Sequence, residues 1–169
     1  MDTTLLAAAL DRMLGPGGAP EELIRLSGGA NMESWSFDRD GQGYVLRRAP
    51  SAQLIAERAY GHDTEAALIR LARTHGVRAP EVLGELTQSD RLGSGYLMGR
   101  SPGTADPRAL LGTPPPSFIE DCARELARIH AIPLAEVPAA LPCTDARMQV
   151  EALATRFEAR IGEDAHEAL

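Results

Sequence analysis

The sequence predicts an α+β fold: a five-stranded antiparallel sheet crossed by one helix, followed by a helical region. Five short segments within the first 100 residues alternate apolar and polar residues, which is typical of strands with one buried face. The segment 52–75, between the third and fourth of these, repeats its apolar residues at helical spacing. Breaks rich in Gly and Pro follow at 101–103 and 112–116, and the periodicity beyond them is helical.

The N-terminal part begins with a short amphipathic helix over 3–14, which the glycine-rich segment 15–18 ends. The period of the apolar residues then changes from helical to two. Asp40-Gly41 is the dipeptide that favours a tight hairpin turn between the last two of the strands expected here. These three antiparallel strands are predicted over 23–26, 34–38 and 44–48.

The crossing helix is expected over 52–75, with a break at 60–62 and Gly76 as its C-terminal cap residue. Two further strands follow over 81–86 and 95–99, separated by a polar stretch. They bring the predicted sheet to five strands.

The C-terminal part is predicted to hold two helices. The first begins after Ser117, where Glu120 three residues later suggests a capping box, and ends before Pro133. The second is amphipathic and covers 147–161. The expected division of the chain is therefore a first lobe over 1–100, a hinge and linker over 101–116, and a partial helical lobe over 117–169.

Composition excludes several classes of function. The 169 residues carry 24 acidic and 17 basic side chains, for a net charge of −7, which argues against nucleic-acid binding. All basic residues are Arg. No apolar run approaches the roughly 20 residues of a membrane helix, and no secretory signal is evident, so we expect a cytoplasmic protein. Cys122 and Cys143 are expected to stay reduced, and neither has a metal-ligand cluster around it.

Five short motifs follow one another along the chain, in the order of the predicted elements. They are Leu-Ser-Gly-Gly-Ala-Asn at 26–31, Tyr-Val-Leu-Arg-Arg-Ala-Pro at 44–50, Gly-Val-Arg-Ala-Pro at 76–80, Tyr-Leu-Met-Gly-Arg-Ser-Pro-Gly at 96–103 and Glu-Leu-Ala-Arg-Ile-His at 125–130. As an ordered set they resemble the aminoglycoside phosphotransferase family of small-molecule kinases, in particular the branch related to kinase-like domains fused to acyl-CoA dehydrogenases. The resemblance implies a protein-kinase-like N-lobe followed by the first helices of a helical C-lobe.

The glycine turn between the first two strands is the first candidate site. Without a Cβ, glycine lets the backbone approach an anion closely and donate N–H groups to it. The pattern alone favours a plain hairpin turn, because a Gly pair between strands is common and no G-x-G-x-x-G motif is present. The resemblance implies that Ser27, Gly28, Gly29 and Asn31 lie over the phosphates of a nucleotide.

The third strand carries the second candidate pair, Val45 and Arg47, which alternation places on one face of the sheet. The resemblance implies that Val45 lies under the adenine and that Arg47 contacts the α- and β-phosphates. The family usually has Lys at this position, whereas Arg binds phosphate through two N–H groups. Glu65 on the following helix is the expected partner of this cation, with Glu57 as the alternative. A solvated Arg and an exposed helix Glu are the simpler interpretations.

The third candidate is the end of the last strand together with the residues after it, Tyr96-Leu97-Met98 followed by Gly99-Arg100-Ser101, which resemble the hinge of the family. Met98 would line the back of the adenine pocket, and the Gly99 carbonyl and Ser101 N–H would face the edge of the base. A plain edge strand that leads into a loop would show the same pattern. Among the histidines, His130 is expected to pack structurally, and the His62-Asp63 pair has no assigned role.

The catalytic motifs of the family are absent from the sequence. Members use a His-Gly-Asp loop, then an Asn and a second Asp that bind Mg²⁺. Neither motif occurs here, and Asn31 is the only asparagine. We therefore expect no catalytic or metal-binding residue in this chain, and Mg²⁺ only with a C-terminal half.

The resemblance thus implies the ATP-binding portion of a phosphotransferase that moves the γ-phosphate of ATP to a small-molecule alcohol. The chain is expected to be inactive by itself. It is also expected to self-associate through the apolar face of the helix at 147–161. The acceptor and the choice of ATP over GTP stay open. A non-catalytic nucleotide-binding or regulatory module is the alternative, and a protein with only a structural role is a third.

Overall fold

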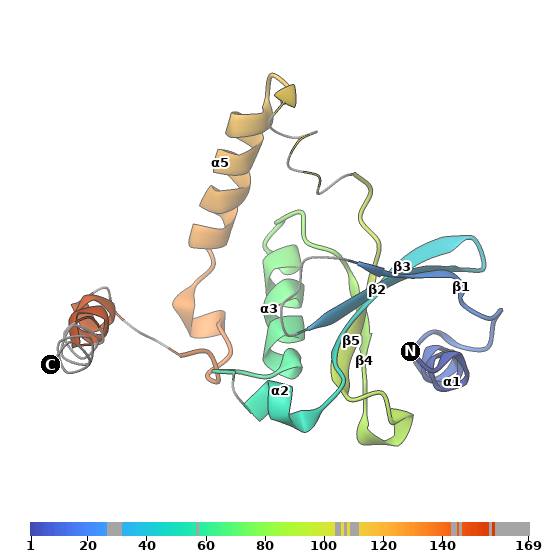
Figure 1. Ribbon diagram of the computed structural model, residues 1–169. Coiled ribbons are helices and arrows are strands. Elements are labelled where there is room, and N and C mark those ends of the chain that lie inside the picture. Colours follow the sequence, from blue (N-terminus) through green and yellow to red (C-terminus); the bar gives the residue numbers. More distant parts are fainter. Residues whose placement is uncertain are drawn as a thin grey trace, which may run out of the picture.

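The computed structural model describes residues 1–26, 32–56, 58–103, 106, 108, 112–142, 145, 147–155 and 157. Figure 1 shows a twisted sheet with α1 (Thr3–Leu14) on one side, α3 (His62–Thr74) on the other, and α5 (Phe118–His130) set apart from the sheet. The predicted α+β fold is confirmed.

The sheet has five strands, all paired antiparallel as predicted. The hairpin turn at Asp40-Gly41 has φ of 51° and 76°, and two consecutive positive values are what a tight two-residue hairpin requires. The strand order is β1-β2-β3-β5-β4. The strands are β1 (Glu21–Leu26), β2 (Glu33–Arg39), β3 (Gln42–Ala49), β4 (Val82–Glu85) and β5 (Ser94–Gly99).

One face of the sheet forms the core against α1. Leu6 and Leu10 of α1 lie four residues apart, so they project from the same side of the helix onto the sheet. Asp2 caps the helix by accepting from the N–H groups of its first turn. The fully buried strand residues beneath them are Phe37, Leu46 and Leu97. Alternation then leaves Val45 and Arg47 on the opposite face, which α3 covers in part.

The crossing helix is divided where the sequence predicts. α2 (Ala52–Ala56) ends before the break, and α3 begins at His62. α3 ends before Gly76, whose φ of 77° is the left-handed conformation common after a helix C-terminus. The break allows α3 to start a new direction and to place its first turn against β5.

α5 begins after Ser117 as predicted, but the capping box with Glu120 is wrong. The Phe118 N–H donates to the Pro115 carbonyl, and this turn holds Ser117 at ψ 0° instead of the extended conformation of an N-cap. The Ser117 hydroxyl donates to Asp121 instead, and Glu120 pairs with Arg124 at 2.6 Å. The α5 residues described include none that is buried.

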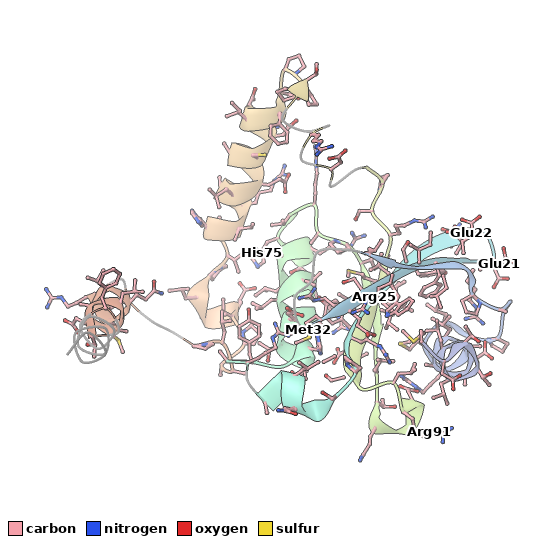
Figure 2. The ribbon with its side chains drawn as sticks, in the orientation of Figure 1. Glu21, Glu22, Arg25, Met32, His75 and Arg91 are labelled. Carbon is pink, nitrogen blue, oxygen red and sulfur yellow. The ribbon has the colours of Figure 1, made fainter. Side chains whose placement is uncertain are left out.

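The C-terminal segments contact the first lobe through a few polar side chains. Glu125 of α5 accepts from the Arg78 N–H at 2.9 Å, and Glu136 of η2 (Leu134–Glu136) lies 2.9 Å from His75 Nε2. Figure 2 shows His75 at the end of α3, on the side toward this segment. Residues 147–155 and 157 are helical, whereas 158–161 of the predicted helix lie outside the described residues.

Many apolar side chains of these C-terminal helices are exposed. The large exposed ones are Ile119, Leu126, Ile129, Leu134, Met148, Val150, Leu153 and Phe157. Among the described residues, none of the helices combines the length and the apolar character that crossing a membrane requires.

Candidate functional site

A cavity of about 470 Å³ lies on the sheet face opposite α1, within the size range of small-molecule sites. Its floor comes from β1, β2 and β3, and its wall comes from the segment that follows β5. The lining residues are Leu26, Ser36, Val45, Arg100, Ser101, Pro102 and Gly103. Two of the predicted site residues, Val45 and Ser101, thus line one cavity.

The predicted hinge is held against the sheet by backbone hydrogen bonds. Met98 pairs with Val45 in the register of β3 and β5, so the two side chains are neighbours on the cavity face. The Gly99 N–H donates to the Glu81 carbonyl at 2.9 Å, and the Arg100 N–H donates to the Gly43 carbonyl at the same distance. These bonds fix where the segment from residue 101 leaves the sheet.

Arg100 is a cavity residue that the sequence reasoning missed. Its guanidinium donates to two residues of β2, to Ser36 Oγ at 3.2 Å and to Asp38 Oδ1 at 2.6 Å. It lies over Gly43, where the Cβ of any larger residue would come within 2.6 Å of Arg100 Nε. Asp38 lies on the same face as Val45, but no local sequence pattern joins it to Arg100, which comes from the segment after β5.

Arg47 and Glu65 meet further along the same face. Glu65 belongs to the first turn of α3, and its Oε2 lies 3.2 Å from Arg47 Nε. The second contact, from Arg47 Nη2 to Oε1, is 3.5 Å. Both side chains are partly buried. The structure therefore brings together the pair that the sequence predicts, while the alternative partner Glu57 lies outside the described residues.

Three other side chains surround Glu65. Arg58, between α2 and α3, donates to Glu65 Oε1 at 2.8 Å. His62 Nε2 lies 4.0 Å from Oε2, and the His62 ring meets the Tyr96 ring edge to face. His62 Nδ1 is 3.0 Å from Ser94 Oγ. Arg58 had no assigned role, because only the turn between the two helices brings it to Glu65. His62, which also had none, lies three residues before Glu65 in the first turn of α3.

The pKa shifts fix the charges in this group. Burial acts to raise the pKa of Glu65, but hydrogen bonds from Arg58 and Arg47 outweigh it, so the pKa is lowered and the carboxylate is ionised. Burial lowers the pKa of His62, which is therefore neutral at pH 7. Burial, together with Glu65, raises the pKa of Tyr96 to about 12, so its hydroxyl stays protonated.

The remaining predicted site residues are Ser27, Gly28, Gly29 and Asn31, and they lie outside the described residues. Leu26, immediately before them, lines the cavity. No group of three or more His, Cys, Asp or Glu side chains that could hold a metal ion occurs within the described ranges.

The chain matches one family model over most of its length. The model described as the phosphotransferase enzyme family (APH) matches residues 22–168. No curated protein matches the chain.

Solved structures of aminoglycoside phosphotransferase APH(4)-Ia are similar to the chain in fold. One crystal structure has 24% sequence identity and a TM-score of 0.53, and the match covers 78% of this chain and 40% of that chain. A thermostable mutant in its apo form has 23% identity, a TM-score of 0.53 and coverages of 79% and 40%. A thermostable mutant in ternary complex with AMP-PNP and hygromycin B has 24% identity and a TM-score of 0.50, and the match covers 77% of this chain and 40% of that chain. The chain thus spans about 40% of the length of these structures.

Proposed function

The chain belongs to the phosphotransferase enzyme family, and on that premise we propose that it is the ATP-binding portion of a small-molecule phosphotransferase. The proposed reaction moves the γ-phosphate of ATP to a hydroxyl group of a small molecule. One observation carries the proposal: a cavity suited to a base and a guanidinium suited to phosphate lie on the same face of one sheet. Val45 lines the cavity, and Arg47 carries the guanidinium.

The proposed arrangement follows the third strand. Two residues along a strand span about 7 Å, so a base against Val45 would direct its phosphates toward Arg47. Glu65 would hold the Arg47 guanidinium in place through the 3.2 Å contact. We place the Gly99 carbonyl and the Ser101 N–H at the edge of the base, with Met98 behind it. Ser27, Gly28, Gly29 and Asn31 would donate backbone N–H groups to the phosphates.

The lobes would divide these tasks. Residues 1–100 would form the nucleotide-binding lobe, residues 101–116 the hinge and linker, and residues 117–169 part of the helical lobe. The sequence contains no His-Gly-Asp loop and no asparagine beyond Asn31, so the usual residues for Mg²⁺ and for the acceptor hydroxyl are absent. We therefore propose that the chain does not catalyse transfer by itself and that Mg²⁺ binds only together with a C-terminal half.

Nucleotide binding has support in the similar structures. The APH(4)-Ia mutant described above binds AMP-PNP and hygromycin B. Its fold similarity makes a nucleotide in the corresponding lobe the natural expectation for this chain. A hydroxyl-bearing small molecule is the corresponding acceptor class.

The test is a titration of the purified chain with ATP. A hydrogen bond to a charged group contributes about 1.5–3 kcal/mol, so Arg47→Ala is expected to weaken ATP binding about 10- to 100-fold. Arg124→Ala is the matched control, because that guanidinium pairs with Glu120 and Asp121 on α5, which belongs to the partial helical lobe. Unchanged ATP affinity in Arg47→Ala would refute this site, and turnover of ATP with Mg²⁺ and any small alcohol would refute the proposed inactivity.

We also propose that the chain self-associates through its last helix. Met148, Val150, Leu153 and Phe157 are 56–71% exposed. An apolar set of this kind along one helix is an unfavourable surface for a monomer in water. A second copy of the same helix would cover it.

A further inference from the structure

Two guanidinium groups share the carboxylate of Glu65. Arg58 Nη2 donates to Oε1 at 2.8 Å, which is closer than either contact that Arg47 makes with the same carboxylate. The Arg58 guanidinium also lies 5.4 Å from the centre of the Tyr60 ring, a cation–π contact on its other side. Arg58 is therefore held in place independently of Arg47.

The charges of this group do not cancel. Arg47 and Arg58 are cations, Glu65 is ionised, and His62 and Tyr96 are neutral at pH 7. The two guanidinium groups and the carboxylate that they share therefore carry a net charge of +1, and Asp63 is a further carboxylate whose charge acts on His62. An isolated Arg47–Glu65 pair would be neutral and would attract an anion only weakly.

Two buried nitrogen atoms without a hydrogen-bond partner lie beside Glu65. Arg58 Nη1 and His62 Nε2 are the buried side-chain nitrogen atoms that lack a hydrogen-bond partner in the part of the chain that the structure describes. Both residues flank Glu65. Buried polar atoms are normally paired, so their concentration around one carboxylate points to a site whose polar contacts are incomplete.

We propose that Arg58 is a positioning residue for the phosphate-binding cation Arg47, an inference that rests on the proposed function. Arg58 takes Oε1 of Glu65 and so orients the carboxylate, which leaves Oε2 for Arg47 Nε. It also supplies the second positive charge, so Arg47 faces the phosphates without being neutralised by Glu65. The ligand that this arrangement fits is the polyphosphate of a nucleotide.

The consequence is a selective effect on charged ligands. Without Arg58, Glu65 is free to turn toward Arg47 and to neutralise it. Affinity for ATP should then fall, while affinity for adenosine, which has no phosphate, should stay the same. A merely structural role for Arg58 would weaken both ligands together.

The experiment measures ATP and adenosine binding to the purified chain by titration calorimetry. Arg58→Gln is expected to weaken ATP binding about 5- to 30-fold and to change adenosine binding less than about twofold. Arg58→Lys, which keeps the charge but makes a single point contact, should lose less. Arg124→Gln is the control and should match the wild type for both ligands.

A double variant tests whether Arg58 acts on ATP binding through the Glu65 carboxylate. In a Glu65→Gln background, adding Arg58→Gln should cost less ATP affinity than it costs in the wild type, because the carboxylate that Arg58 orients is already gone and only its charge is lost. A full further loss would mean that Arg58 contacts phosphate directly and would overturn the positioning role. Where circular dichroism shows that Arg58→Gln is unfolded, Arg58→Lys decides by the same ATP-to-adenosine comparison.

Four further results contradict the proposal. Equal losses for ATP and adenosine, or no loss in either variant, would overturn the role of Arg58 while leaving nucleotide binding intact. A wild-type chain that binds adenosine but shows no added affinity for ATP would refute the proposed phosphate contact of Arg47, and the role of Arg58 with it. A wild-type chain that binds neither ligand would refute the proposed function itself, and the role of Arg58 with it.

Discussion

Replacing Asp90 by Asn tests how α1 is fastened to the sheet. Asp90, the last residue of η1 (Gln88–Asp90), accepts from Arg12 Nε at 3.0 Å and from Arg12 Nη2 at 2.6 Å. It also accepts from the Thr87 N–H at 2.7 Å. The Asp90 side chain is 6% exposed and that of Arg12 is 40% exposed. The carboxylate therefore joins α1 to the loop between β4 and β5.

The expected loss of stability follows from these contacts. Asn keeps the shape of the side chain and one acceptor oxygen, but it loses the charge that strengthens both bonds from Arg12. Hydrogen bonds to a charged group contribute about 1.5–3 kcal/mol, and the half-exposed Arg12 regains water when the pair is lost. We expect Asp90→Asn to lower the free energy of unfolding by about 2 kcal/mol, measured by urea denaturation at pH 7. Glu120→Gln, which removes an exposed ion pair, should cost only about 0–1 kcal/mol.

The stability that Asp90 contributes should depend on pH, and the shift in its pKa gives the direction of that dependence. Burial acts to raise the pKa of Asp90, but hydrogen bonds from Arg12 and Thr87 outweigh it and lower the pKa below its usual value. A carboxyl whose pKa is lower in the folded state stabilises the fold above its unfolded pKa of about 3.9. That contribution is lost as the pH falls through the lower, folded value. The difference between wild type and Asp90→Asn should therefore narrow below about pH 4.

Two results would refute the reasoning about Asp90. One is a cost of Asp90→Asn no larger than that of Glu120→Gln at pH 7. The other is a difference in unfolding free energy that stays constant as the pH falls from 7 to below 4. The first result would mean that the fully buried apolar residues of α1 alone hold the helix on the sheet. The second would mean that the loss does not arise from the ionised carboxylate.

Two further predictions concern the core and the last helix. Leu46→Ala should lower the free energy of unfolding by about 2–5 kcal/mol in the same assay, because Leu46 is fully buried in the central strand beneath α1. Leu134→Ala, at a side chain that is 86% exposed, should change it by less than about 0.5 kcal/mol, and equal effects would contradict this placement of the core. Sedimentation equilibrium should show a mass that rises with concentration for the wild type and a monomer for Leu153→Glu; a wild type that stays monomeric would exclude the proposed self-association.

Much of the fold could be predicted because its signals are local. The hairpin at Asp40-Gly41 needs only two residues that accept positive φ, and the break before α3 needs only residues that interrupt helical spacing. The predicted capping box at Ser117 does not form, because a turn closed onto the Pro115 carbonyl holds the Ser117 backbone at ψ 0°. The spacing of residues in a sequence indicates which side chains could form a cap. It does not indicate whether a neighbouring turn gives the backbone a different conformation.

The site residues that could be predicted are likewise those whose signals are local. Val45 and Arg47 share a face because strands alternate, and Glu65 lies in the first turn of the helix that packs on that face. Arg58 and Arg100 could not be placed in this way. Each reaches the site from a segment between regular elements, so its position depends on the tertiary path of the chain.

The replacement of the expected lysine by Arg47 and the presence of Arg58 belong together under the proposed function. A lysine ammonium is a point charge that one glutamate can hold while other donors still face a phosphate. A guanidinium can be bound along a whole edge by a carboxylate, which neutralises it. Here the shorter 2.8 Å contact goes to Arg58, and Arg47 keeps only the longer contacts of 3.2 and 3.5 Å. Sharing Glu65 between two arginines thus lets a chain without lysine present a cation that is held in place and still carries a net charge toward a phosphate.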